Sequence, residues 1–169
     1  MSSDRVIGVD VGGTKIAAGI VTRDGTIEAR TERPTPTDTE EAVVDGLLGV
    51  VAELIGNQEI AAIGLGVPAT VDQRTGSAIS AVNIPFTDVP LRSLMTERFG
   101  VPCGVDNDAN AAAIAEWQVG AGKGTRYMVM LTLGTGVGGG VILDGRPFRG
   151  SSGAASELGH MVIGECPSN

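Results

Sequence analysis

Aromatic residues are scarce in this sequence, and their scarcity restricts how its core can be built. Phe, Trp and Tyr make up 3% of the 169 residues, whereas 42% of the residues are hydrophobic. The core must therefore consist mainly of Val, Ile, Leu and Ala side chains. The length suffices for one ordinary domain with a real core, or for one and a half small lobes.

Basic clusters, cysteines and long apolar runs are scarce as well. The net charge is −8 without any run of Lys or Arg, and neutralising phosphates supplies most of nucleic-acid binding, so nucleic acid is a poor candidate partner. Two cysteines, Cys103 and Cys166, do not make a disulfide framework. No apolar run approaches the roughly 20 residues of a membrane span, and the N-terminus lacks the regions of a signal peptide. We expect a cytoplasmic protein that binds neither nucleic acid nor membrane.

The order of apolar patterns predicts an α/β fold. Residues 5–10, 15–22 and 26–33 predict an antiparallel meander, and an amphipathic helix over 38–55 follows, with Thr37 and Glu40 as its capping box. The next patterns predict a buried strand at 60–67, a loop region at 68–88 and a short helix at 89–100. They are followed by a strand at 101–108, a helix at 109–122, and two strands at 126–134 and 138–145. We therefore expect a mixed sheet with helices on its faces, and a break between two lobes near 120–125.

Glycine, in contrast, is abundant, with 26 of the 169 residues against a usual share of roughly 7%. The stretch GVDVGGTK at residues 8–15 has the glycines, the Thr and the Lys of a phosphate loop. It does not fit the P-loop of nucleoside triphosphatases, because Thr14 precedes Lys15 and because a hairpin turning at Asp24-Gly25 follows instead of a helix.

A second glycine cluster, LGTGVGGG at 133–140, predicts a similar hairpin. It matches G-x-G-x-x-G but is no dinucleotide-binding fingerprint, because the β-branched segment GVILDG follows where a helix is required. Turns rich in Gly and Thr can point several backbone N–H groups at one anion, since glycine tolerates the necessary φ values. The two turns could clamp a polyphosphate between two lobes; the alternative is that both are merely tight turns.

Two charged residues flank the first glycine turn. Asp10 ends the preceding strand and suits Mg²⁺, which prefers a few carboxylates and keeps its waters; a turn-capping role is the alternative. Lys15 could neutralise phosphate charge or be a solvated lysine at a strand edge.

The stretch VDNDANAA at 105–112 places four polar residues, Asp106, Asn107, Asp108 and Asn110, at a strand–helix junction. One is expected as the N-cap of the helix, which leaves three unexplained by structure alone. A carboxylate at the carboxyl end of a strand in an α/β fold lies where ligands usually bind. Such a group could accept the proton of a substrate hydroxyl that attacks a phosphoryl group.

Glu157 and His160 lie three residues apart, on one face if their segment is helical, and His160 is the single histidine of the chain. A lone histidine is more often structural than catalytic. The neighbouring carboxylate also suits a role in binding hydroxyl groups or a metal.

Taken together, five stretches of this sequence resemble successive motifs of the ROK family of bacterial sugar kinases and repressors: GVDVGGTK, GLGVPATVD, VDNDANAAAIAE, LTLGTGVGGGVILDG and ASELGHMVI. The resemblance extends over essentially the whole chain. It implies the actin-like, ribonuclease H-like ATPase fold, with sugar and ATP in the cleft between two lobes. Residues 1–120 would form a complete N-terminal lobe, and residues 121–169 the beginning of the C-terminal lobe.

The resemblance also implies roles for individual residues. Asp108 resembles the catalytic base that takes the proton from the 6-hydroxyl of the sugar, and Asp10 would serve Mg²⁺. The residues implied to bind or adjoin the sugar are Gly66, Asn83, Asn107, Asp108, Glu157 and His160. Those implied to face the ATP phosphates are Asp10, Gly12, Gly13, Thr14, Lys15, Gly134, Thr135 and Gly136.

The sequence departs from the family pattern at three places. Ala69 stands where the family usually has a second glycine after GVP. In the family the histidine of GH also ligates a structural zinc with three cysteines, whereas here only Cys166 could join His160, and a closed zinc site needs four ligands. The family's chains also continue well beyond this length, so the chain looks truncated.

These observations favour an ATP-dependent hexose kinase that converts glucose to glucose 6-phosphate. N-acetylmannosamine, N-acetylglucosamine and fructose are alternative substrates, and polyphosphate is an alternative donor. The absence of a helix-turn-helix segment ahead of the first strand and the negative charge favour a kinase over a repressor. The family suggests a homodimer for the full-length form. The competing hypothesis is an inactive fragment, or a sugar-binding lobe without catalysis.

Overall fold

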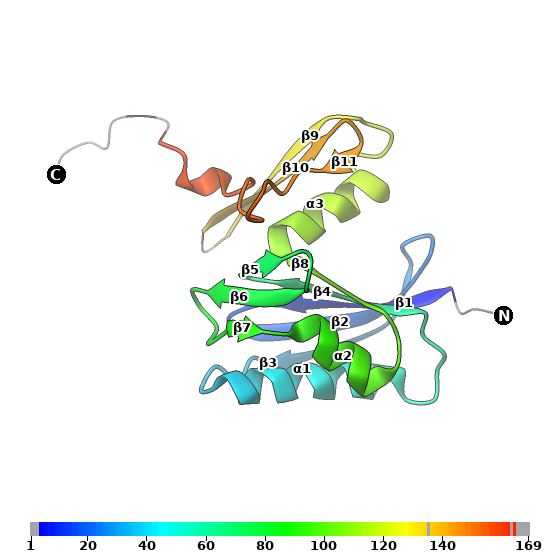
Figure 1. Cartoon of the computed structure of the whole chain (residues 1–169). Coiled ribbons are helices and arrows are strands. Elements are labelled where there is room, and N and C mark those ends of the chain that lie inside the picture. Colours follow the sequence, from blue (N-terminus) through cyan, green and yellow to red (C-terminus); the bar gives the residue numbers. More distant parts are fainter. Residues whose placement is uncertain (1–3, 135, 163, 165–169) are drawn as a thin grey trace.

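A computed structural model of the chain describes residues 4–134, 136–162 and 164. Its largest unit is a five-stranded sheet with the strand order β3-β2-β1-β4-β8 (Figure 1). The first three strands are antiparallel neighbours, while β4 and β8 run parallel to β1. The strands are β1 (Arg5–Val11), β2 (Lys15–Thr22), β3 (Ile27–Pro34), β4 (Ala62–Val67) and β8 (Cys103–Asn107). The expected meander and mixed sheet are confirmed.

One face of this sheet is buried by α1 (Glu40–Ile55), which lies below β1–β3 in Figure 1. Alternate strand residues such as Ile7, Val9 and Ile20 meet the apolar stripe of the helix, which includes Leu47 and Val51. Among the described residues, Phe86 is the single aromatic side chain in the buried core. The expectation of an aliphatic core is confirmed.

The predicted capping box of α1 is wrong by two residues. Thr39, not Thr37, is the N-cap, and its hydroxyl accepts the backbone N–H of Ala42 at 3.1 Å. Glu40 therefore stands at the first helical position, too early to reach back to the cap. Its carboxylate instead accepts the backbone N–H of Thr87 at 3.2 Å, which links α1 to the start of a short strand, β7 (Thr87–Val89).

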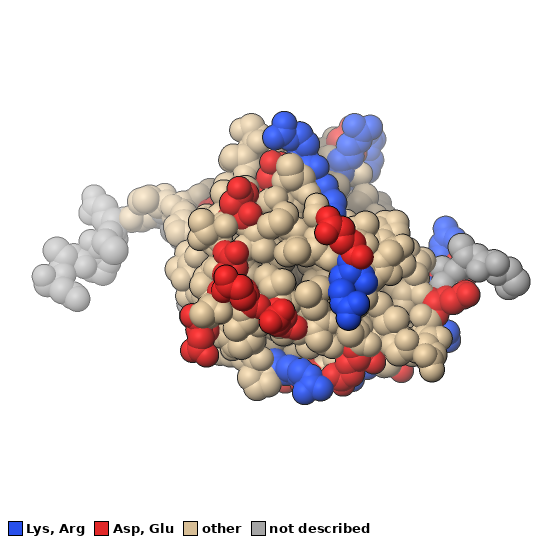
Figure 2. All heavy atoms as spheres, turned by 60° about the horizontal axis from the view of Figure 1, so that its bottom comes forward, with Lys and Arg blue, Asp and Glu red and all other residues tan. Residues whose placement is uncertain are grey.

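The region expected to be a loop contains a small antiparallel sheet in the order β5-β6-β7. Its strands are β5 (Ala69–Asp72), β6 (Ser77–Ala81) and β7 (Thr87–Val89). They are short, and one register shift between Thr70 and Val71 interrupts the pairing of β5 with β6, so little alternation in the sequence indicates them. The helix α2 (Leu91–Phe99) follows and packs against β6 and β8. Figure 2 shows the side of the molecule that carries α1 and α2, with acidic side chains spread across it.

A separate three-stranded sheet consists of β9 (Met128–Leu133), β10 (Val137–Leu143) and β11 (Arg146–Pro147). The helix α3 (Asp108–Gln118) lies between the two sheets and packs on β4 and β8 as well as on β9 and β10 (Figure 1). A short 3₁₀ helix, η1 (Leu158–His160), also packs against β10. No helix of the described part combines the length and apolar character that crossing a membrane requires.

The glycine run at 138–140 lies within β10, not in the hairpin turn. A Cβ on Gly138 would lie 3.1 Å from the Cβ of Ala109, and one on Gly140 would overlap the Cβ of Ala113. On the other face, a Cβ on Gly139 would lie 2.7 Å from the carbonyl oxygen of Ser156. These glycines allow α3 and the segment before η1 to approach the strand from its two faces.

Two glycine substitutions test this explanation. We expect Gly140→Ala to lower the free energy of unfolding by about 1–3 kcal/mol, because the added methyl must push α3 away from β10. Gly64→Ala in β4 is the matched control, since its Cβ meets nothing within 4 Å, and we expect a change between zero and about 1 kcal/mol of stabilisation. Urea denaturation measures both; equal losses in the two variants would contradict the packing argument.

Candidate functional site

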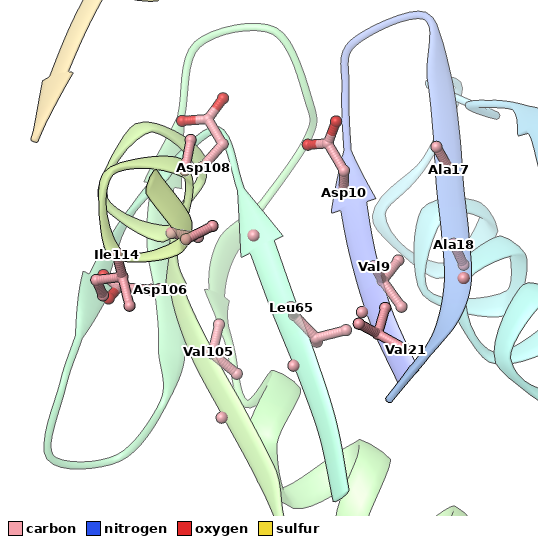
Figure 3. Close-up of a pocket in the computed structure, with 18 of the residues that line it drawn as sticks. Val9, Asp10, Ala17, Ala18, Val21, Leu65, Val105, Asp106, Asp108 and Ile114 are labelled. Atoms are coloured by element: carbon pink, nitrogen blue, oxygen red, sulfur yellow. The ribbon is translucent and has the colours of Figure 1, made fainter. Parts of the chain in front are cut away.

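The parallel register of the large sheet brings polar residues from distant parts of the chain to one edge. Asp10 pairs with Gly66, and Gly66 pairs with Asp106, so the carboxyl ends of β1, β4 and β8 are level. Asn107 and Asp108 follow directly. Figure 3 shows Asp10 and Asp108 at the same end of a cavity, on either side of β4.

Local hydrogen bonds shape the junction between β8 and α3. Asn107 is the N-cap, and its Oδ1 accepts the backbone N–H groups of Ala109 at 3.0 Å and Asn110 at 3.2 Å. Asp108 Oδ1 accepts the same N–H of Ala109 at 2.8 Å. Within the described residues, no other residue donates a hydrogen bond to the second oxygen of Asp108. One oxygen of this carboxylate therefore orients the side chain while the other is available to a ligand.

The surroundings of Asp108 raise the pKa of its carboxyl above the ordinary value. Partial burial is the main cause, because it penalises the charged form. The negative charges of Asp10 and Glu157 add to this rise in pKa, whereas hydrogen bonds from the backbone N–H groups of Ala109 and of Asp108 itself oppose it. A carboxylate with a raised pKa is a better proton acceptor than an ordinary aspartate as long as it stays ionised at the working pH.

The cavity beside these carboxylates has a volume of about 820 Å³ and runs along the sheet face opposite α1. A row of four glycines in register forms its floor, one from each of four strands: Gly8, Gly19, Gly64 and Gly104. Of the described residues that the sequence assigned to the site, only Asp10, Gly66 and Asp108 line this cavity.

Gly66 lies beside the residues that begin α3. A Cβ at this position would lie 3.5 Å from both the Cα of Asp108 and the Cβ of Ala111. Gly66 is buried, and these are ordinary van der Waals distances, so β4 and the first turn of α3 are in contact at this position.

The first glycine turn joins β1 to β2, and Gly12 N–H donates to the carbonyl oxygen of Lys15 at 2.8 Å. Neither Gly12 nor Gly13 has a positive φ, so left-handed backbone is not the reason for glycine here. A Cβ on Gly13 would lie 3.3 Å from the Cβ of Asn83, which makes close approach the reason. Thr14 and Asn83 are exposed.

Lys15 forms an ion pair with Glu32 on the neighbouring strand β3, at 2.8 Å, and both side chains are about half exposed. The pair lowers the pKa of Glu32, chiefly through the hydrogen bond from Lys15. This contact favours the strand-edge alternative for Lys15 over phosphate neutralisation.

The second glycine turn, between β9 and β10, closes with a hydrogen bond of 2.9 Å from Gly134 N–H to the carbonyl oxygen of Gly136. Both glycines are exposed. Thr135 lies outside the described residues.

Glu157 directly precedes η1, and His160 ends it. The two side chains are exposed and face each other, with 3.9 Å between Nε2 of His160 and Oε2 of Glu157. Their expected position on one face is therefore confirmed, although the segment is a single 3₁₀ turn rather than an α-helix.

The donor groups differ in how well they suit metals. Asp10 fits Mg²⁺, which is commonly held by one or two carboxylates together with water and substrate phosphates. For zinc, the described part of the chain contains no cluster of three or more His, Cys, Asp or Glu side chains. Cys166 lies outside the described residues, so His160 has no closed zinc site among those described.

Sequence patterns missed the partners of Asp106. Arg149, in the segment after β11, donates two hydrogen bonds to its Oδ2, and Gln73, in the β5–β6 turn, donates one to its Oδ1 at 3.1 Å. Asp106 and Arg149 are 43 positions apart, and nothing in the local sequence signals their pairing.

Comparison with known proteins decides the family. The family model described as ROK family matches residues 6–168. The chain belongs to the ROK family. A curated ROK relative, the glucokinase of Streptomyces coelicolor, is 44% identical over 155 residues, which are 92% of this chain and 49% of that protein.

Solved structures agree with this assignment. The crystal structure of a ROK family glucokinase from Streptomyces griseus, in complex with glucose and AMPPNP, matches with a TM-score of 0.87 and 41% identity over 94% of this chain and 51% of that one. An inorganic polyphosphate/ATP-glucomannokinase from Arthrobacter sp. strain KM matches with a TM-score of 0.79 and 35% identity over 95% and 65%. The expected actin-like fold of the ROK family is confirmed. The chain spans about half the length of the curated relatives it matches.

The raised pKa of Asp108 predicts how stability depends on pH. Its folded-state pKa exceeds its unfolded value, so at neutral pH, above both, the ionised carboxylate costs the folded state free energy. Asp108→Asn stays neutral and keeps an acceptor for Ala109. We expect Asp108→Asn to raise Tm at pH 7. The gain should disappear below about pH 4, where the carboxyl of Asp108 is protonated in both the folded and the unfolded state.

Glu32→Gln is the control with the opposite sign. The pKa of Glu32 is lowered in the folded protein, so its loss should reduce Tm slightly at pH 7 or leave it unchanged. Calorimetric scans of the wild type and of both variants at several pH values measure these differences in Tm. A lower Tm for Asp108→Asn at pH 7 would contradict the proposed environment of Asp108.

Proposed function

We propose that the protein to which this chain belongs transfers the γ-phosphoryl group of ATP to the 6-hydroxyl of a hexose, with glucose as the first candidate. The observation that carries the proposal is the position of Asp108. It lies at a strand–helix junction, faces a large cavity, keeps one carboxylate oxygen available, and has a raised pKa.

Asp108 acts as the general base. As the 6-oxygen of the hexose bonds to the γ-phosphorus, the bond from that phosphorus to the β,γ-bridging oxygen breaks, and ADP leaves. Asp108 takes the proton of the 6-hydroxyl, which keeps the attacking oxygen from developing positive charge. Mg²⁺ held near Asp10 would supply charge neutralisation for the phosphate oxygens.

The surrounding residues position the two substrates. Asn107 uses its Oδ1 for the helix cap, so its NH₂ group is the part left to donate to a sugar hydroxyl. The side chains of Glu157 and His160 can form further hydrogen bonds with sugar hydroxyl groups. Both side chains are exposed in this chain and are therefore accessible to a sugar. The turns at residues 12–14 and 134–136 would face the phosphates. In this arrangement residues 1–120 form one lobe and residues 121–169 begin the second.

The site is compatible with more than one hexose acceptor and more than one phosphoryl donor. N-acetylmannosamine, N-acetylglucosamine and fructose present hydroxyl groups that the same side chains could bind. The Arthrobacter protein is named for both polyphosphate and ATP, so polyphosphate is retained as an alternative donor.

A second candidate is sugar binding without catalysis. The chain covers only 49% of the Streptomyces coelicolor glucokinase, and phosphoryl transfer needs both substrates held in place with water excluded. Under this hypothesis residues 1–169 bind a hexose but release no ADP. We expect this outcome for the chain by itself, and turnover for the full-length form.

The test combines calorimetric titration of the chain with glucose and a coupled ADP-release assay in the presence of ATP, Mg²⁺ and each candidate hexose. The intact mass of the native gene product shows which length the cell makes. Saturable hexose binding supports the proposed site, whereas brisk ATP-dependent phosphorylation by residues 1–169 would contradict the expectation for this chain.

The base assignment is tested in the full-length form. Asp108→Asn should reduce kcat by about 10²–10⁴-fold, because an amide cannot accept the proton. The Tm of the same variant shows that the loss is not caused by unfolding. An Asp108→Asn protein that keeps most of its rate would refute the assignment.

A further inference from the structure

Asp106 accepts four hydrogen bonds, two on each carboxylate oxygen. Its Oδ2 accepts from Arg149 Nε at 2.8 Å and Nη2 at 2.5 Å, and its Oδ1 accepts from Asn107 N–H at 2.9 Å and from Gln73. The side chain of Asp106 is 13% exposed and that of Arg149 26%. Charge-assisted bonds shielded in this way are stronger and more directional than those of surface ion pairs.

Arg149 belongs to a segment whose two ends are joined by hydrogen bonds and which leads directly into Glu157. Its carbonyl oxygen accepts the backbone N–H of Ala155 at 3.2 Å, and the carbonyl oxygen of Phe148 accepts the hydroxyl of Ser156 at 3.2 Å. Ser156 is 4% exposed. Because these bonds tie the two ends of the segment together, a displacement of Arg149 also displaces Glu157.

The other carboxylate oxygen of Asp106, Oδ1, contacts the backbone just before α3. The bond from Asn107 N–H to Asp106 Oδ1 orients the peptide that precedes Asn107. Asn107 in turn caps the helix that begins with Asp108. One carboxylate therefore connects the Glu157 segment to the residues at the strand end.

We propose that Arg149 is a positioning residue, whose ion pair with Asp106 holds the segment of Glu157 and His160 at the strand end that presents Asn107 and Asp108. The proposal rests on the hexose-binding function proposed above, because the groups that Arg149 brings together are assigned there to the hexose. Arg149 itself need not touch the sugar. Removing the Arg149 side chain leaves all the residues assigned to the hexose in place in the sequence. It frees Glu157 and His160 to move relative to Asn107 and Asp108.

Hydrogen exchange tests the positioning contact without any ligand. Arg149→Gln should accelerate amide exchange by about tenfold or more in residues 150–160, while the amides of α1 exchange at the wild-type rate. The matched control is Arg126→Gln, which removes the exposed ion pair between Arg126, just before β9, and Asp144, just after β10, and should leave exchange in residues 150–160 unchanged. Wild-type exchange in residues 150–160 of Arg149→Gln, or equal acceleration throughout the chain, would overturn the proposal.

Calorimetric titration with glucose tests the consequence for the site. We expect Arg149→Gln to raise the Kd for glucose by about tenfold, Arg149→Lys to recover part of this loss, and Arg126→Gln to bind like wild type. A general loss of stability would lower Tm without recovery by lysine, so Tm is measured for every variant. Unchanged glucose affinity in Arg149→Gln counts against the positioning role.

The two proposals fail in different ways. If the wild-type chain binds no hexose, the proposed function fails for residues 1–169, whereas exchange in residues 150–160 still decides whether Arg149 holds the segment. Adding Asp106→Asn to Arg149→Gln gives a further check in the exchange experiment. If the two residues act through one contact, the double variant exchanges no faster in residues 150–160 than the more affected single variant. If the two substitutions accelerate exchange in residues 150–160 additively, the proposal that Arg149 acts through Asp106 is wrong.

Discussion

The parallel pairing of β1, β4 and β8 is the constraint on which the site depends. It places Asp10, Gly66 and Asp106 side by side although they lie at three distant positions in the chain. Parallel strands end at the same edge of a sheet, so the polar residues after β8 meet the acidic end of β1 there. A slip of one residue would turn the acidic side chain of the shifted strand to the opposite face of the sheet.

Small residues lie where α3 contacts both sheets, and on β10 they set how closely the helix approaches. Gly66 faces the first turn of the helix on one side, and Gly138 and Gly140 face Ala109 and Ala113 on the other. Larger side chains would separate the layers, and Asp108 would move with the helix that carries it. The glycines of β10 therefore affect the position of Asp108 although they do not line the cavity.

Asp106 and Asp108 are two residues apart and have different environments. Asp106 is held by four hydrogen bonds, two of them from a guanidinium, and it serves to orient neighbouring segments. Asp108 is partly buried near two other carboxylates, and the resulting rise in its pKa costs stability at neutral pH. Such a cost is typical of residues that are retained for chemistry, since active sites are where pKa values are most often perturbed.

The sequence by itself determined the meander, the main helices and the strand–helix junction at Asn107 and Asp108, because these depend on local periodicity and on N-cap chemistry. It also contained the motifs that identify the family. Only the tertiary structure decided that Gly138–Gly140 serve helix packing, that Lys15 pairs with Glu32, and that Arg149 reaches Asp106. These contacts join positions far apart in the chain, and their geometry arises only when strands pair in register and helices pack, which no local pattern encodes.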